Sequence, residues 1–405
     1  MAVFYNLAIW VYGAAIRLAS LWNKKARDWV KGRKNWQGQL EMDAPPCGFD
    51  LWMHCSSLGE FGQGRPVLES FRNLYPDKKI LLTFFSPSGY AIRKNYPGAD
   101  LVTYLPLDTK KNARDFLRLA NPVLSVFVKY DFWPNMMKEI LAEKRRAYLI
   151  AAKFHSGDQF HSWYGAWTQK FLQAFEIIFL QDDQKVSFYP DDRQIISGDT
   201  RMDRVIRIQE EQKTSSVLQS WKKGPVFIWG SIWPEDLLIL KEGIHGPLKD
   251  WQHIIAPHDI SPSMISRIVE NVRGSSDLFS SGKIESKVVI LDTIGDLASC
   301  YSLGELAYIG GGFGKGIHNI QEPLAAGLPV FFGPKHQKFI EGSESLEREC
   351  GFSVSSEKEF FDNLKPLLEK ENRDKASNTA KEYIRSKAGA TEIILDHIKA
   401  QIHNP

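Results

Sequence analysis

A carboxylate beside a glycine is the first group in this sequence that could do chemistry. Glu60 follows an apolar run, Leu51–Cys55, that predicts a buried strand, and a helix is expected from about Gly64 with Pro66 in its first turn. Glu60 would then lie on a loop at the carboxyl end of a strand, where α/β folds bind ligands. With Gly59 leaving room for a substrate hydroxyl, such a carboxylate can act as a general base. The residues alone equally allow a solvated or helix-capping glutamate.

A second stretch, residues 309–334, has the order strand, glycine loop, helix, strand. Its strands are expected at Leu306–Ile309 and Pro329–Phe332, and its helix opens near Glu322. Gly310–Gly312 would allow a ligand to approach the backbone, and the helix N-terminus would offer N–H groups to an anion. Glu322 could accept hydrogen bonds from a ribose diol. An ordinary βαβ turn with glycines for packing explains the shape equally well.

Composition indicates a globular protein with room for two domains. The chain has 405 residues, of which 43% are hydrophobic and 24% charged, with a net charge of +3. Its cysteines show no C-x-x-C spacing, which fits a reducing compartment and gives no metal motif. They are Cys47, Cys55, Cys300 and Cys350.

The N-terminal segment predicts contact with a membrane. Residues 2–22 are mostly apolar, interrupted by Asn6 and Arg17, and the first 34 residues carry a charge of +6. A signal peptide has the reverse order, with its charge first. The segment can just span a bilayer, or it can lie in the interface with basic residues on anionic lipid. Its basic flank would keep the bulk of the chain in the cytoplasm. A helix packed on the protein itself is the alternative.

The wording of the glycine stretch, GGGFGKGIHNIQEPLAAGLPVFFGP, closely resembles the nucleotide-sugar loop of the Kdo transferases. These inverting GT-B glycosyltransferases transfer 3-deoxy-D-manno-octulosonic acid (Kdo) from CMP-Kdo to a lipid A precursor. The segments HCSSLGEFGQGRPVLE, at Glu60, and DTIGDL, at residues 292–297, are also similar to motifs of this family. The resemblance implies an α/β protein with two doubly wound, Rossmann-like domains facing a central cleft.

On the acceptor side, the resemblance implies that Glu60 is the catalytic base and that Ser57 and Gly59 shape its loop. Lys129 and Asp131 stand where the family commonly has two glutamates. Asp131 can keep a catalytic or acceptor-contacting role, whereas Lys129 reverses a charge.

Arg201 stands at a cationic position of the family's motif. Its guanidinium could hold the sugar carboxylate or the leaving phosphate. A surface salt bridge to Asp199 or Asp203 is equally compatible with the sequence.

The donor side is expected in the second half of the chain, where His258 replaces a usual arginine. The resemblance implies no cofactor besides the donor substrate CMP-Kdo, and no metal is expected. The implied donor-binding residues are Gly230, Ser231, Pro257, His258, Ile294, Gly295, Asp296, Gly312, Asn319, Ile320, Gln321 and Glu322.

The sequence divides into five expected parts. Residues 1–34 would form the membrane-associated helix with its basic flank, and residues 35–205 the acceptor-binding domain. A linker is expected at 206–223 and a CMP-Kdo-binding domain at 224–375. Terminal helices at 376–405 would pack back toward the acceptor domain.

These inferences predict an enzyme at the cytoplasmic face of the inner membrane that transfers Kdo from CMP-Kdo to a lipid A precursor, in lipopolysaccharide synthesis. Its partners would be CMP-Kdo, the precursor and the membrane, with no nucleic acid. One alternative is another nucleotide-sugar enzyme of GT-B type, such as a UDP-sugar transferase or epimerase. The other is a non-catalytic, membrane-tethered binder of nucleotide sugars or glycolipids.

Overall fold

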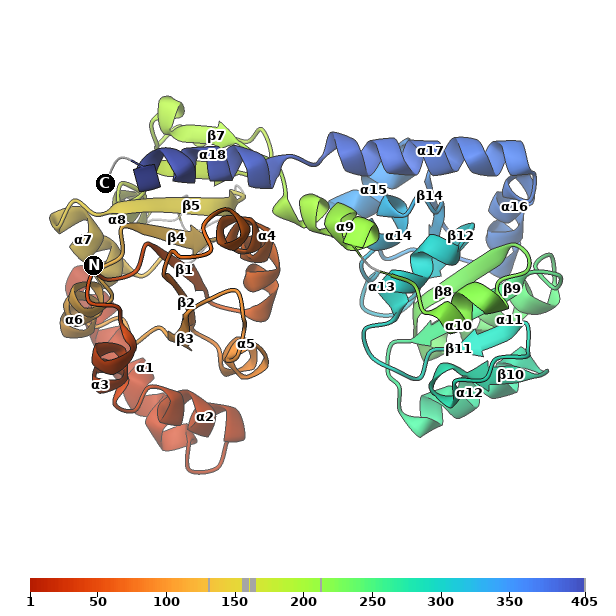
Figure 1. Cartoon of the computed structure of the whole chain (residues 1–405), viewed down its shortest axis with the longest axis horizontal. Coiled ribbons are helices and arrows are strands. Elements are labelled where there is room, and N and C mark those ends of the chain that lie inside the picture. Colours follow the sequence, from red (N-terminus) through yellow and green to blue (C-terminus); the bar gives the residue numbers. More distant parts are fainter. Residues whose placement is uncertain (130–131, 155–159, 161–164, 212, 404–405) are drawn as a thin grey trace. The chain divides into compact units, whose positions relative to one another are not determined.

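The computed structural model describes residues 1–129, 132–154, 160, 165–211 and 213–403. The chain forms two compact units, Met1–Asp203 with Ala388–Pro405, and Arg204–Lys387. Over the described residues, each unit is built on a seven-stranded, all-parallel sheet with helices on its faces (Figure 1). This is the predicted α/β architecture of two doubly wound domains.

The first sheet reverses its strand order between β1 and β4. Its order is β3-β2-β1-β4-β5-β6-β7. Ligands of doubly wound sheets bind outside the carboxyl ends of the strands at such a switch point. The strands are β1 (Leu51–Cys55), β2 (Ile80–Phe84), β3 (Leu101–Tyr104), β4 (Leu124–Val128), β5 (Arg146–Ala152), β6 (Ile177–Leu180) and β7 (Gln194–Ile196).

Both faces of this sheet are buried, which is why its central strands are continuous apolar runs. Leu51 and Met53 of β1 face one core, together with Phe71 and Ile394 from two covering helices. Trp52, between them, faces the other core.

Helices cover both faces of the first sheet, and α9 then leads into the second unit. The first unit contains α1 (Ala2–Ala19), α2 (Lys24–Gly32), α3 (Trp36–Asp43), α4 (Leu58–Leu74), α5 (Pro87–Arg93), α6 (Lys110–Ala120), α7 (Pro134–Ala142), α8 (Gly165–Leu172) and α18 (Ala390–His403), and α9 spans Thr200–Glu211.

Helix α4 begins six residues earlier than the sequence suggested. The expected start at Gly64 rested on Pro66 as a first-turn residue, but Pro66 is buried inside the helix. The start is set by a capping box, in which the Ser57 hydroxyl accepts from the backbone N–H of Glu60 and the Glu60 carboxylate accepts from the backbone of Ser57. Glu60 therefore lies in the first turn of α4 and not on a loop.

The second sheet has its own switch point, between β8 and β12. Its order is β10-β11-β9-β8-β12-β13-β14. The strands are β8 (Val226–Ile232), β9 (Gln252–Pro257), β10 (Ser276–Leu278), β11 (Val288–Ile290), β12 (Leu306–Ile309), β13 (Val330–Phe332) and β14 (Gly351–Ser353).

The second unit includes the expected linker and part of the segment that was expected to form terminal helices. Residues 206–223 hold the end of α9 and α10, and α17 belongs to this unit, so that only α18 lies in the first one. The helices of this unit are α10 (Ser216–Trp221), α11 (Leu237–His245), α12 (Pro262–Val272), α13 (Leu297–Cys300), α14 (Gln321–Ala325), α15 (Ile340–Glu347), α16 (Glu357–Leu367) and α17 (Lys370–Ser386).

Helix α1 is long and apolar enough to cross a bilayer, by its length and its mean hydropathy of 1.4. It nevertheless contacts the first unit through polar groups. The Tyr5 hydroxyl donates to Asp108 Oδ2 at 2.7 Å, and Asn135 Nδ2 donates to Asn6 Oδ1 at 2.9 Å. Gly13 lies so close to Leu107 that a Cβ there would meet Leu107 Cδ2 at 2.7 Å.

Asp108 joins α1 to the start of α7. Its buried carboxylate accepts from the backbone N–H of Asn135 (Oδ2) and of Met136 (Oδ1), both at 2.9 Å, in addition to Tyr5. The two N–H groups belong to the first turn of α7, which has no partner for them within the helix. One carboxylate thus holds both helices.

We predict that Asp108→Asn lowers the free energy of unfolding by about 1–3 kcal/mol, because the new NH2 group must face at least one buried N–H donor. Urea unfolding of the full chain at pH 7 measures this. Asp77→Asn, at an exposed position, is the control and should leave stability unchanged. An equally stable Asp108→Asn protein would show that the carboxylate holds neither helix.

Candidate functional site

Glu60 lies where the first sheet reverses its order, directly after β1. Its Oε2 accepts from the backbone N–H of Ser56 at 2.5 Å and of Ser57 at 3.2 Å. These two donors fix the carboxylate at the N-terminus of α4 and favour its ionised form. The helix-capping alternative is therefore correct. It is compatible with a role as general base, because such a base must also be ionised and fixed in place.

Gly59 leaves open space beside this carboxylate. It is exposed, and a Cβ added there would meet only Ser57 Oγ, at 3.9 Å. No neighbouring side chain in the described structure therefore demands a glycine at this position. Gly64, one turn later, differs, since a Cβ there would meet Met53 Sδ and Val128 Cγ2 at 2.9 Å.

Lys129 lies on the other side of the same switch point, directly after β4. Its backbone is left-handed, with φ of +69°, and its N–H donates to the Ile150 carbonyl at 2.8 Å. Asp131 lies outside the described residues. The described residues resume at Phe132, and the indole N–H of Trp133 donates to His54 Nε2 at 3.2 Å. The buried His54 therefore helps to fix the end of the predicted acceptor segment.

Arg201 forms an ion pair with Asp199, one of the two partners considered in its alternative role. Its Nε and Nη2 both donate to Asp199 Oδ2, at 2.8 and 2.5 Å. Asp203 takes no part in this pair, because its carboxylate accepts from the backbone N–H groups of Gly389 and Thr391 at the start of α18. An anion at Arg201 would have to compete with Asp199.

The glycine loop after β12 is packed against its own chain. A Cβ at Gly310 would meet the Ser231 carbonyl oxygen at 2.4 Å, and one at Gly312 would meet the backbone of Gly333 at 2.6 Å. Gly311 has φ of +93°. Packing against the chain's own backbone therefore accounts for these glycines without the ligand that the sequence analysis expected to approach them. Gly230 is likewise required by packing, because its Cβ would meet Ile309 and Tyr301.

The buried Asp236 holds this loop. Its carboxylate accepts from the N–H of Gly311 at 3.0 Å, the N–H of Trp233 at 2.9 Å and the hydroxyl of Tyr308 at 2.8 Å. Burial raises the pKa of Asp236, and the three donors oppose this shift. The carboxylate therefore links the β8 turn to the β12 loop at the second switch point.

Three aromatic rings stack beside the glycine loop. The rings of Trp233 and His258 have centroids 4.2 Å apart, and those of His258 and His318 are 4.5 Å apart. The indole N–H of Trp233 donates to His318 Nε2 at 2.7 Å. This bond assigns the His318 proton to Nδ1. Partial burial, and secondarily His258, lower the pKa of His318, which favours the neutral ring.

A cavity of about 460 Å3 lies at the carboxyl ends of β9 and β11. It brings together four of the predicted donor residues, Pro257, His258, Ile294 and Gly295. Ile294 is 87% exposed, so its side chain is accessible to a ligand in this cavity. Asp296 does not line this cavity, and its Oδ2 accepts from the Thr293 hydroxyl at 2.5 Å.

Asn319 and Glu322 are also brought together, whereas the residues between them belong to the core. Asn319 Nδ2 donates to Glu322 Oε1 at 3.0 Å, and burial raises the pKa of Glu322. Ile320 and Gln321 are buried, and Gln321 donates to Glu341. Helix α14 spans Gln321–Ala325, which agrees with the expected opening near Glu322.

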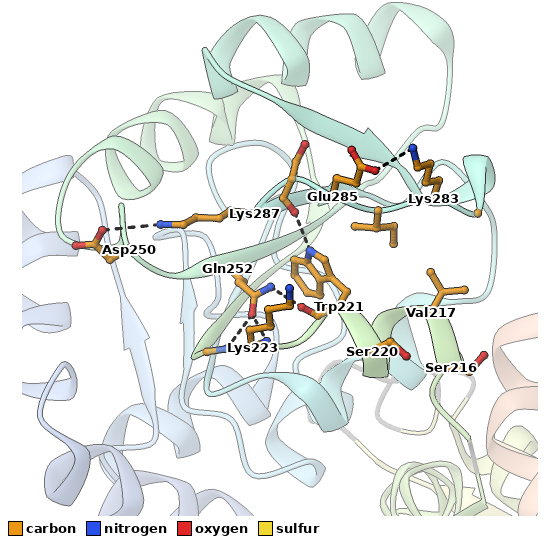
Figure 2. A pocket seen from close by; sticks show the side chains of 14 residues that line it. Ser216, Val217, Ser220, Trp221, Lys223, Asp250, Gln252, Lys283, Glu285 and Lys287 are labelled. Carbon is orange, nitrogen blue, oxygen red and sulfur yellow. Dashed lines mark hydrogen bonds and ion pairs between the residues drawn. The ribbon is translucent and has the colours of Figure 1, made fainter.

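Another cavity of this unit, of about 810 Å3, lies at the opposite edge of the sheet. Figure 2 shows Trp221, Gln252 and three lysines around it, near the amino ends of β8, β9 and β11. The Gln252 amide binds three groups of the chain, since it accepts from the backbone N–H of Lys223 and Gly224 and donates to the Trp221 carbonyl. Doubly wound folds bind ligands at the carboxyl edge, so we do not assign the site here.

Sequence reasoning missed Trp233, Asp236 and His318. The tryptophan and the aspartate lie within four residues after the end of β8, a position that could have drawn attention to them. Their role depends on contacts with residues 75 to 85 positions away in the sequence, which no local pattern reveals.

We predict that Asp236→Ala exposes the glycine loop, because it leaves the N–H of Gly311 without an acceptor. Hydrogen exchange of the Gly311 amide should accelerate by an amount equivalent to about 1–3 kcal/mol. Asp236→Asn should retain most of the protection, since an amide oxygen can take the place of Oδ2. Equal exchange in all three proteins would contradict this role.

The first unit matches a family model described as 3-deoxy-D-manno-octulosonic-acid transferase (kdotransferase), over residues 22–203. The 3-deoxy-D-manno-octulosonic acid transferase of Aquifex aeolicus (strain VF5) is 27% identical over 346 residues, covering 83% of this chain and 91% of that protein. Other curated proteins of the same name are 23% to 25% identical over 82% to 88% of the chain.

Solved structures share the two-domain fold at much lower identity. UDP-GlcNAc 2-epimerase from Neisseria meningitidis has a TM-score of 0.60 and 14% identity, covering 85% of this chain and 98% of that one. A glycosyltransferase from Rickettsia africae ESF-5 has a TM-score of 0.54 and 13% identity, covering 88% of this chain and 100% of that one. These likenesses confirm the GT-B type of fold. The family model and the curated relatives together support assigning the chain to the Kdo transferases.

Proposed function

We propose that this Kdo transferase uses CMP-Kdo as donor and a hydroxyl of a lipid A precursor, lipid IVA, as acceptor, with inversion at the anomeric carbon. The observation that carries the proposal is the ionisable Glu60, fixed at the switch point of the first sheet. The donor residues at the carboxyl edge of the second sheet support it, because a cavity there is lined by Pro257, His258, Ile294 and Gly295.

Glu60 would take the proton of the acceptor hydroxyl while its Oε2 stays bound to the Ser56 and Ser57 N–H groups. The acceptor oxygen then attacks the anomeric carbon of Kdo as the bond to the cytidylate breaks. The proton remains on Glu60 and is later lost to solvent. CMP leaves as an anion, so its departure needs positive charge or hydrogen-bond donors and no further acid.

The second unit would bind the cytidylate at the 460 Å3 cavity, with Asn319 and Glu322 at its phosphate and ribose. His258 takes the place of the usual arginine. It is exposed and stacked on His318, and a ring N–H of His258 could donate a hydrogen bond to a bound phosphate. No resident metal is part of this proposal.

We further propose that the enzyme sits on the cytoplasmic face of the inner membrane, with α1 lying in the interface. Phe4, Leu7, Trp10 and Leu18 of α1 are all more than half exposed. Tyr5, in the first part of the helix, and Gly13, in the second, contact the first unit. An α1 that spanned the bilayer would have to give up those contacts, whereas an interfacial helix keeps them.

We predict that Glu60→Gln abolishes Kdo transfer and keeps both folding and donor binding. The glutamine oxygen can accept from the Ser56 and Ser57 N–H groups, so the capping box survives, but the amide cannot take a proton. Transfer of radiolabelled Kdo and binding of CMP-Kdo measure the two effects.

Glu60→Ala separates the two roles of this side chain. It should lose transfer and, in addition, about 1 kcal/mol of stability with the cap. Near-normal turnover by Glu60→Gln would refute the base, and the capping role alone would then remain.

We predict that Gly59→Ala impairs transfer without destabilising the protein. Alanine favours a helix over glycine by up to about 1 kcal/mol, and the methyl group meets no atom of the chain closer than 3.9 Å. If the acceptor hydroxyl approaches Glu60 on this side, kcat/KM should fall by roughly tenfold or more.

Gly64→Ala is the matched comparison, because it lies in the same helix but lacks space. It should lower the melting temperature. A Gly59→Ala enzyme with full activity would show that the acceptor approaches from elsewhere.

A further inference from the structure

A cavity of about 390 Å3 lies among the N-terminal helices of the first unit, apart from both switch points. We call it the Arg33 cavity. Its walls come from α1, α2 and the segment that leads into α3, with residues before and within α6 (Figure 1). Its charged lining residues within the described chain are all basic, namely Arg17, Lys31, Arg33 and Lys34.

Arg33 carries a buried guanidinium whose hydrogen-bond partners are neutral backbone carbonyls. Its side chain donates to the backbone carbonyls of Leu105 at 2.8 Å, Phe85 at 2.7 Å and Trp29 at 3.3 Å. Among the described residues, no carboxylate pairs with it. A guanidinium has five N–H donors, so these bonds leave capacity for an anion. Burial lowers the pKa of Arg33 to about 9, which is the effect expected of a missing negative partner.

Trp29 adds an unused donor to the same wall. The side chain is 6% exposed, and its indole N–H is buried without a hydrogen-bond partner. Its ring also stacks under the guanidinium of Arg33, with Cζ 3.9 Å from the ring centroid. Buried donors are normally satisfied, so an orphaned one next to a basic cavity points to a ligand that the protein alone does not supply.

We propose that the Arg33 cavity binds the phosphate of an anionic phospholipid headgroup. Four basic side chains and a spare indole N–H suit the oxygens of a phosphate diester. Its volume is that of a small-molecule site.

The source of the ligand follows from the neighbouring helix. Arg17 belongs to α1, and exposed apolar side chains follow it in the sequence, Leu18 within the helix and Leu21 and Trp22 in the turn after it. A lipid whose acyl chains lie against these residues could place its headgroup in the cavity. The choice of a lipid over free phosphate rests on the proposed interfacial placement of α1. The anion site itself does not depend on that placement.

The test uses the full chain with Lys31→Gln and Lys34→Gln combined, because both side chains are exposed and the fold does not depend on them. The matched control combines Lys24→Gln and Lys25→Gln. It removes the same charge from exposed positions of the same basic segment, outside the cavity lining. Binding is measured to phosphatidylcholine vesicles with and without phosphatidylglycerol, and by calorimetry to dihexanoyl-phosphatidylglycerol below its micelle concentration.

We expect one molecule of the short-chain lipid to bind per chain. The cavity variant should lose roughly tenfold or more of its affinity for this lipid and for anionic vesicles, and the control much less. Equal losses in both variants would mean that the basic surface attracts lipid diffusely, and the proposal would be wrong. Inorganic phosphate that binds the wild type as tightly as the lipid does would overturn the choice of a lipid.

These outcomes are independent of the catalytic proposal. A failure of Kdo transfer would leave calorimetry with the short-chain lipid unaffected. A chain that binds no vesicle of either composition would contradict the membrane placement of α1, while the soluble lipid would still test the cavity.

Discussion

Backbone N–H groups at the carboxyl edges of the two sheets need acceptors, and single carboxylates supply them. Glu60 binds two N–H groups where α4 begins, and Asp236 binds the glycine loop where the second sheet reverses its order. Asp108 does the same for α7. Where a strand ends beside a switch point, the turn that follows leaves backbone N–H groups without a partner in the sheet or helix. Water reaches these groups only in part, so they need an acceptor from the protein. Each carboxylate fixes the turn on which candidate site residues lie.

Much of this arrangement could be predicted from local pattern. Leu51–Cys55 and Leu306–Ile309 are strands with the expected bounds, because both of their faces are buried and each apolar run ends at a polar or glycine residue. The edge strands β10 and β14 escaped prediction, since three residues with little apolar content carry no such signal. The start of α4 was misplaced because the proline suggested a first turn, whereas the capping box of Ser57 and Glu60 decided it.

The site was predictable in its positions and less so in its contacts. Pro257, His258, Ile294 and Gly295 share one cavity, and their role in donor binding stays a prediction. The glycines at 310 and 312, however, are required by the chain itself, and Arg201 is paired with Asp199. Trp233 and His318 came together only in three dimensions, where they and His258 form a stack at the place of a missing arginine. Contacts between residues far apart in the sequence cannot be predicted from the pattern of any single segment.

The central claim is that this chain moves Kdo from a cytidylate donor to a lipid acceptor, using only its own side chains at the two switch points. The most direct measurement incubates the purified full chain with labelled CMP-Kdo and lipid IVA, and in parallel with UDP-GlcNAc. The account predicts labelled lipid and stoichiometric release of CMP, with no change in the UDP-sugar. Epimerisation of UDP-GlcNAc, or binding of CMP-Kdo without any labelled lipid, would contradict it.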